Sequence, residues 1–158
     1  MERFTFAFLL FLALVACTPD SPSKELLHQE VVDMLHQYHA AIKKSGLHAE
    51  FDYLDPSSDF FWVPPGYESA LSYDSVRAIL EGNAHMFEAI DFHWETLDVH
   101  ILSPEIATYS GIVTGSMTDT SGVSSGVAIL ESGTLIKRAD GWKLLSGQSV
   151  ALESQPVD

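Results

Sequence analysis

The sequence predicts an α+β domain in which a curved antiparallel sheet packs against three N-terminal helices. Four long segments with strand-like composition, 91–102, 105–118, 122–138 and 141–152, follow one another with only short turn sequences between them. Long strands joined by short turns are antiparallel neighbours. Such a sheet needs a cover on its apolar face, and the first half of the chain has the helical periodicity to provide it.

The first helix is predicted from about residue 24 to residue 45. Ser21 or Ser23 is suited to cap its start, and Gly46 suits the position just after its end. Apolar residues recur at helical spacing along one face: Leu27, Val31, Met34, Leu35, Tyr38, Ala41 and Ile42. This face is expected to cover the sheet.

Three shorter elements are expected between this helix and the sheet: a second helix over 47–54, a strand over 59–63 and a third helix over 74–89. The sheet then begins with a change of phase. Phe92 and Trp94 share one parity, whereas Leu97, Val99 and Ile101 share the other. A β-bulge near Glu95–Thr96 would bring all five to one face and would bend the sheet. A bent sheet has a concave side, where we expect a pocket.

Residues 1–16 are predicted to be a signal peptide, because Arg3 precedes an apolar run too short to span a membrane. Leu14-Val15-Ala16-Cys17 resembles the lipobox of bacterial lipoproteins, which implies lipidation of Cys17. The alternative is an ordinary secretory signal with an incidental cysteine. Residues 17–23 would then form a lipidated tether, 24–152 the folded domain and 153–158 a tail.

The membrane would be a partner through the Cys17 lipid. Thr18 follows where an Asp would resemble an inner-membrane retention signal. The expected location is therefore the bacterial cell envelope, at the outer membrane facing the periplasm. The formal net charge of −14 argues against a nucleic-acid partner, which requires a cationic surface. A single cysteine cannot form an internal disulfide.

The order of elements resembles the nuclear transport factor 2-like superfamily, with its SnoaL-like and ketosteroid isomerase-like branches most similar. The segments that carry the resemblance are HQYHAAIKKSGLHAEFDYL (36–54), FFWVPPG (60–66), SYDSVRAIL (72–80) and IKRADGWKLLSGQSV (136–150). The resemblance covers about residues 24–152 and implies a cone-shaped fold with an internal pocket. It also implies that a homodimer through the outer face of the sheet is a reasonable expectation.

The isomerase branch uses a helix tyrosine, a strand carboxylic acid and a carboxylate base, so the resemblance gives Tyr38 the role of the tyrosine. The base position falls near Trp62, Val63 and Pro64, which are uncharged, and Glu131 is the one acid in the strand run that would carry the other group. The donor is thus present and the base is missing. Tyr38 is alternatively a core-edge aromatic residue.

Many SnoaL-like proteins carry histidines at the positions that Ser146 and Gln148 hold here. Both side chains can hydrogen-bond a ligand, but neither is a general base near neutral pH, and both also fit ordinary strand polarity. His39 and His93 are the histidines expected nearest the pocket, and with Tyr38 they are the weak catalytic candidates. No metal or cofactor motif is present, so none is predicted.

Three functions remain open at this point. The first is binding of a small apolar or amphipathic ligand in the pocket, without clear catalytic machinery. The second is oligomerisation or docking of a partner through the sheet, and the third is a SnoaL-like enzyme of the isomerase, cyclase or hydratase type. The residues expected to line the pocket are Tyr38, Phe61, Trp62, Phe87, Trp94, Tyr109, Ser146 and Gln148.

Overall fold

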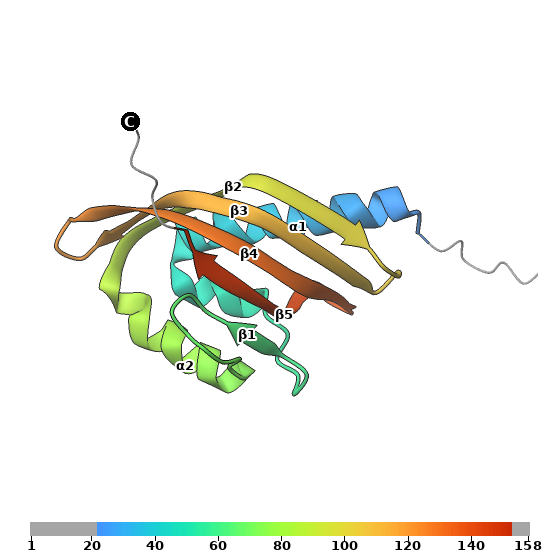
Figure 1. Cartoon of the computed structure of the whole chain (residues 1–158), viewed down its shortest axis with the longest axis horizontal. Helices are drawn as coiled ribbons and strands as arrows, with labels where there is room; N and C mark the ends of the chain where they lie inside the picture. Colours follow the sequence, from blue (N-terminus) through green and yellow to red (C-terminus); the bar gives the residue numbers. More distant parts are fainter. Residues whose placement is uncertain (1–21, 153–158) are drawn as a thin grey trace, which may run out of the picture.

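The computed structural model describes residues 22–152, so Cys17, the predicted signal peptide and the tail 153–158 lie outside it. The elements are α1 (Lys24–Ser45), η1 (Leu47–Asp52), β1 (Phe61–Val63), α2 (Tyr73–Asn83), η2 (Ala84–Met86), β2 (Phe87–Ile101), β3 (Ile106–Asp119), β4 (Ser124–Arg138) and β5 (Gly141–Ala151). The predicted α+β class is confirmed: a curved, open sheet carries the N-terminal helices (Figure 1).

The sheet has the strand order β1-β5-β4-β3-β2. Strands β2 to β5 form the antiparallel meander that the short turns predict. The short strand β1 is parallel to β5 and covers that edge of the sheet. Strand β1 thus lies beside β5 and forms one wall of the space between the sheet and the helices.

Three register shifts interrupt the long strands, the first of them at the start of β2 between Phe87 and Ala89. The pairing of β2 with β3 shifts again between Trp94 and Thr96, which confirms the predicted bulge. The third shift lies in β5, where Leu144 pairs with Leu135 and Ser146 with Thr134, so that Leu145 has no partner. Each bulge moves the following residues to the other face of the sheet.

The helix α1 has the boundaries that its end signals predict. The hydroxyl of Ser23 accepts a hydrogen bond from the backbone N–H of Leu26, and Gly46 follows the last turn with a φ of 73°. Helix α2 is shorter than predicted: it ends at Asn83, and the chain passes through η2 into β2 at Phe87. The weak helix propensity of Gly82 and Asn83 is consistent with this early end.

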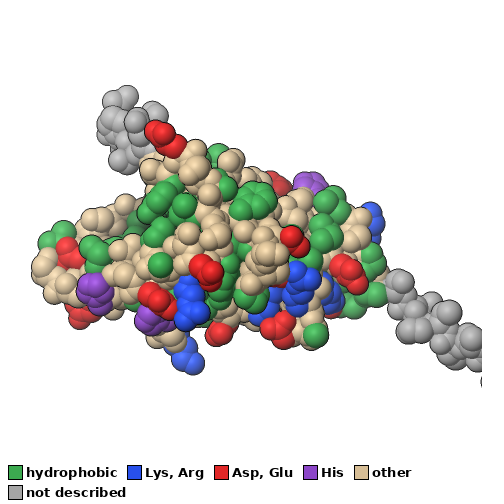
Figure 2. Space-filling view, turned by 90° about the horizontal axis from the view of Figure 1, so that it is seen from below, with side chains coloured by type: hydrophobic (Ala, Val, Ile, Leu, Met, Phe, Trp, Pro, Cys, Tyr) green, Lys and Arg blue, Asp and Glu red, His purple; other side chains and the backbone are tan. Residues whose placement is uncertain are grey.

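The core lies between α1 and the sheet. Side chains of the apolar stripe on α1, including Leu27, Val31 and Leu35, are almost completely buried against inward residues such as Ala107 and Leu135. Acidic, basic and apolar side chains are interspersed on the face seen in Figure 2. Within residues 22–152, no helix combines the length and the apolar character needed to cross a membrane.

Candidate functional site

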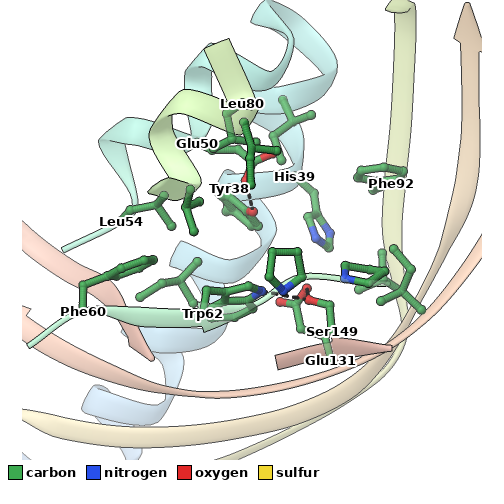
Figure 3. A pocket seen from close by; sticks show the side chains of 18 residues that line it. Tyr38, His39, Glu50, Leu54, Phe60, Trp62, Leu80, Phe92, Glu131 and Ser149 are labelled. Carbon is green, nitrogen blue, oxygen red and sulfur yellow. Dashed lines mark hydrogen bonds between the residues drawn. The ribbon is translucent and has the colours of Figure 1, made fainter. Parts of the chain in front are cut away.

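A cavity of about 190 Å³ lies between the helices and the sheet. Its walls come from α1, η1, α2, the segment around β1 and the inner face of the sheet (Figure 3). Most of the lining is apolar, and the polar groups are few. The lining residues are Tyr38, His39, Ile42, Glu50, Leu54, Phe60, Trp62, Pro64, Pro65, Val76, Ile79, Leu80, Phe92, Val113, Ile129, Glu131, Leu144 and Ser149.

The first polar pair in the cavity is Tyr38 on α1 and Glu50 on η1. The Tyr38 hydroxyl donates a hydrogen bond of 2.8 Å to Oε2 of Glu50. Within the described residues, no group donates to the other carboxyl oxygen, Oε1. Glu50 is therefore a carboxyl with one oxygen held by the protein and one oxygen left for another partner.

The second carboxyl belongs to Glu131 on β4 and is held on both oxygens. Tyr109 donates to Oε1 at 2.7 Å, and Ser149 donates to Oε2 at 3.2 Å. The indole N–H of Trp62 in turn donates to the Ser149 hydroxyl at 3.1 Å. These hydrogen bonds tie β1, β3, β4 and β5 together at the cavity floor, where Figure 3 shows Trp62, Ser149 and Glu131 converging.

Burial changes the acidity of both carboxyls. Loss of water around Glu50, opposed by the Tyr38 hydrogen bond and aided by the negative charge of Glu131, raises its pKa from 4.5 to about 7. Glu50 is partly exposed as a residue, but its carboxyl faces the apolar cavity, and this accounts for the shift. Desolvation also raises the pKa of Glu131, against the hydrogen bonds from Tyr109 and Ser149.

His39 supplies a third polar group, from the same helix as Tyr38. The side chain is 5% exposed, and its ring stacks on Trp94 with centroids 4.9 Å apart. Burial lowers the pKa of His39 to about 4, so the ring is neutral near pH 7. Its Nδ1 atom is buried and has no hydrogen-bond partner among the described residues.

Solved structures with the same arrangement identify the fold. A nuclear transport factor 2-like superfamily protein from Salmonella enterica has a TM-score of 0.70 at 11% identity, covering 86% of this chain and 99% of that one. A protein of that family from Streptomyces avermitilis, provisionally assigned as a dehydratase, has a TM-score of 0.70 at 16% identity, with coverages of 84% and 100%. This chain has a nuclear transport factor 2-like fold.

A third similar structure, from Xanthomonas campestris, is provisionally assigned as a calcium/calmodulin-dependent protein kinase II association domain. Its TM-score is 0.68 at 20% identity, and the match covers 80% of this chain and 89% of that one. The fold therefore occurs both in a protein named as a dehydratase and in proteins named as association domains. No protein-family model and no curated protein matches the sequence.

The nuclear transport factor 2-like fold brings part of the predicted pocket together. Tyr38, Trp62 and His39 line the cavity. Tyr109 and Trp94 point to the same side of the sheet and lie one layer behind the lining, with their rings edge to face at 5.7 Å. Phe87 packs against the core at the start of β2 and does not contribute to this cavity.

Four predicted residues lie elsewhere, and we correct their placement. Phe61, Ser146 and Gln148 border a shallow groove on the outer face of the sheet. Counting from Trp142 in steps of two puts Ser146 and Gln148 inside, but the bulge at Leu145 turns both outward. His93 is also exposed on that face, where its Nε2 lies 3.0 Å from the hydroxyl of Thr114.

The sequence analysis does not predict that the carboxyls of Glu50 and Glu131 share one cavity. Glu50 lies in a short 3₁₀ helix between Ala49 and Phe51, and nothing in the sequence around it distinguishes it from a solvent-exposed acid. Glu131 had a signal, since it is the single acid in the run from Val123 to Leu135. Its parity matches that of Leu135, which is fully buried, so this spacing alone predicts an inward carboxyl.

Residues 22–152 contain no group of three or more His, Cys, Asp or Glu side chains arranged to hold a metal ion. The arrangement is instead suited to hydrogen bonding and proton transfer. A carboxyl that titrates near neutral pH beside a tyrosine hydroxyl can bind a polar group, accept a proton or return one.

Proposed function

We propose that this domain binds a small apolar or amphipathic molecule in the cavity, with the polar end of the molecule at Glu50 and Tyr38. The volume of about 190 Å³ supports a ligand of roughly one ring. Apolar cavities of about 150 Å³ accommodate benzene. Apolar walls with a few convergent polar groups are typical of small-molecule sites.

One observation carries the proposal: Oε1 of Glu50 lacks a donor although the carboxyl lies at a cavity lined mostly by apolar side chains. Glu50 is partly exposed, so this oxygen is accessible to a ligand. A ligand that supplies the missing hydrogen bond would pair it, and the apolar body of the ligand would gain burial from the surrounding side chains.

The test is ligand-observed NMR with single-ring compounds, comparing the wild-type domain with Leu80→Trp. Leu80 lines the cavity, so the larger side chain would fill it and should abolish the binding signals. Leu26→Trp is the matched control, because Leu26 is exposed on α1 and away from the cavity lining. Equal binding by the Leu80→Trp variant would rule out the cavity as the site.

A second candidate function is proton-transfer catalysis, in which Glu50 acts as general base and acid while Tyr38 hydrogen-bonds the substrate. The pKa of Glu50 near 7 favours it, since an acid–base group works best near the ambient pH. Similarity to a provisionally assigned dehydratase supports the same reaction class.

Deuterium incorporation from D₂O into cyclohexanone, next to its carbonyl group, would report such proton transfer. We expect exchange above the buffer background with the wild-type domain. Loss of this exchange in Glu50→Gln but not in Glu68→Gln would support catalysis, since Glu68 is exposed in a loop. Exchange that persists in Glu50→Gln would exclude Glu50 as the base.

We also propose that Cys17 is lipidated and anchors the domain to the bacterial envelope, at the outer membrane facing the periplasm. The support is the sequence Leu14-Val15-Ala16-Cys17 after an apolar run. Mass spectrometry of the mature protein from a bacterial membrane fraction should find an acylated Cys17 at its amino terminus. A Cys17→Ser variant should lack this mass and leave the membrane fraction.

A role in oligomerisation is supported by the outer face of the sheet. Ile112, Leu130 and Val150 are aligned across β3, β4 and β5, and the last two are 43% and 50% exposed. The neighbouring row on these strands is Ser110, Ser132 and Gln148, and it meets the exposed Asp98 of β2, so the uncharged part of the face is confined to β3, β4 and β5. In a chain with 22 acidic residues, an uncharged and partly apolar patch on these three strands suits a homodimer.

A further inference from the structure

The polar atoms of the cavity are unevenly divided between donors and acceptors. The hydroxyl groups of Tyr38 and Ser149 and the indole N–H of Trp62 already donate within the protein. In the described part of the chain, the cavity-lining polar atoms left without a partner are Oε1 of Glu50 and the ring nitrogens of His39. The hydroxyl and indole donors of the lining are thus committed, whereas Oε1 of Glu50 remains a free acceptor and the neutral His39 ring keeps one N–H and one acceptor nitrogen.

The charges of the lining are equally one-sided. Glu50 and Glu131 are its two acidic residues, and the lining contains no Lys or Arg. His39 adds no positive charge near pH 7, because burial lowers its pKa to about 4. An ionised carboxylate in an apolar site requires a compensating charge or hydrogen bonds, and the described lining offers Glu50 the hydrogen bond of Tyr38 alone.

His39 gives independent support for a ligand at this position. His39 is only 5% exposed, and its Nδ1 atom has no hydrogen-bond partner among the described residues. Figure 3 shows the ring projecting from α1 toward the space beside Tyr38 and Phe92. A neutral imidazole has one acceptor nitrogen and one N–H donor, so His39 can receive a hydrogen bond from a cavity ligand in one of its two tautomers.

From these contacts we infer that the cavity selects a monocationic amine with an apolar body of about one ring, whose ammonium group binds Oε1 of Glu50. This inference rests on the proposed binding function and specifies its ligand class. An ammonium group has donors and no acceptor, which complements the free carboxyl oxygen of Glu50. Its positive charge would also compensate the carboxylate.

The surroundings of Glu50 favour the same ligand class. Tyr38, Phe60, Trp62 and Phe92 line the cavity, and aromatic faces attract cations. The net charge of −14 would raise the local concentration of a cation and speed its encounter with the domain. An anion of the same size would meet two carboxyls and no basic side chain in this lining.

The pH dependence follows from the groups that face Glu50. These are Tyr38 from α1 and Glu131 from β4, while His39 lines the same cavity and α2 presents apolar residues to it. Because the pKa of Glu50 is about 7, the carboxyl is mostly ionised at pH 8 and mostly protonated at pH 6. Affinity for a cation should therefore fall about tenfold between pH 8 and pH 6.

Three probes of similar size test the inference: benzylamine as cation, benzyl alcohol as neutral compound and benzoate as anion. Isothermal titration at pH 8 and pH 6 would measure the affinity of each for the wild-type domain. We expect benzylamine to bind at least tenfold more tightly than benzyl alcohol at pH 8. Its affinity should fall about tenfold at pH 6, because the carboxyl must then lose its proton on binding.

Glu50→Gln tests the assignment to one side chain, because the amide keeps an oxygen for the Tyr38 hydroxyl and removes the charge. We expect this variant to lose both the preference for benzylamine and the pH dependence, whereas Glu68→Gln should keep them. Thermal unfolding would establish that each variant is folded. A folded Glu50→Gln variant that still prefers benzylamine would overturn the inference.

The remaining outcomes separate the inference from the function on which it rests. If benzyl alcohol or benzoate binds as tightly as benzylamine, and Leu80→Trp abolishes that binding, the cavity is a ligand site but does not select cations. If none of the three probes binds the folded wild-type domain at millimolar concentration, both the inference and the proposed single-ring site are rejected.

Discussion

Glu50 links the chemistry of the cavity to the stability of the whole domain. The pKa of the Glu50 carboxyl is about 7 in the folded state, against an ordinary value of 4.5 in the unfolded chain. The folded state therefore binds more protons than the unfolded state between these two pH values. The contribution of Glu50 is therefore fully favourable below pH 4.5 and is lost as the pH rises through 7. The same environment that holds a free carboxylate oxygen for a ligand thus reduces stability at alkaline pH.

Glu50→Gln should remove this loss. We expect the unfolding free energy of the wild type, relative to the variant, to fall by about 2 kcal/mol between pH 5 and pH 8. Urea unfolding of both proteins across this range is the measurement. A constant difference between them would mean that the Glu50 carboxyl is not desolvated in the folded state.

The comparison with the variant matters because another residue acts in the opposite direction. The folded pKa of His39 is lowered to about 4, so its contribution is present above pH 6.5 and is lost as the pH falls toward 4. Glu131, with a raised pKa, acts in the same direction as Glu50. The wild-type profile alone would sum these effects, whereas the difference isolates Glu50.

At the scale of single elements, strand β5 forms part of the cavity wall, and at Gly147 its backbone lies very close to β4 and to the Trp62 ring. A Cβ atom added at Gly147 would lie 2.4 Å from the Ser132 carbonyl oxygen and 2.6 Å from the Trp62 ring. Both distances are far below van der Waals contact. The absence of a side chain at Gly147 therefore lets β1 and its Trp62 ring pack directly on β5.

Gly147→Ala should force Trp62 or the backbone to move and should destabilise the domain by about 1–3 kcal/mol. The Trp62 indole would lose its hydrogen bond to Ser149, so probe binding should weaken together with stability. Chemical denaturation and the titrations above measure both. Gly126→Ala is the control, because a Cβ atom there meets nothing within 4 Å and should cause no loss.

The elements also show what a sequence can and cannot predict. The stripe on α1 and the phase change in β2 follow directly from periodicity, and both are confirmed. The bulge in β5 falls on Leu145, an ordinary aliphatic residue between equally ordinary neighbours, so nothing local distinguishes it. Because this bulge is not predicted, the sequence places Ser146 and Gln148 in the cavity. In the structure, Ser149 faces the cavity and those two residues do not.

Glu50 could not be predicted for a different reason. Its environment comes from Tyr38, twelve positions earlier, and from Glu131 far along the chain, and no short pattern encodes their meeting. Glu131 could be predicted as inward from its parity with buried Leu135. Its hydrogen bonds from Tyr109 and Ser149 depend on strand register, which the sequence alone does not specify.

At the scale of the whole molecule, the proposed homodimer predicts a change of mass with one substitution. Leu130→Lys would place a charge in the aligned apolar row of the outer face and should convert a dimer into a monomer. Leu26→Lys is the control: Leu26 is exposed on α1, away from the sheet row, so this variant should remain a dimer. Sedimentation velocity distinguishes these states. A wild-type domain that stays monomeric at high concentration would contradict the homodimer.

The pairing of β1 with β5 has a kinetic consequence. The hydrogen bond from Trp62 to Ser149 joins residues 87 positions apart, so one wall of the cavity cannot form before β5 is in place. Contacts of such long sequence separation form slowly, because a large loop must close first. During synthesis, α1 and strands β2 to β4 leave the ribosome before β5 and can begin to assemble without it. The ligand site would therefore be among the final features to form.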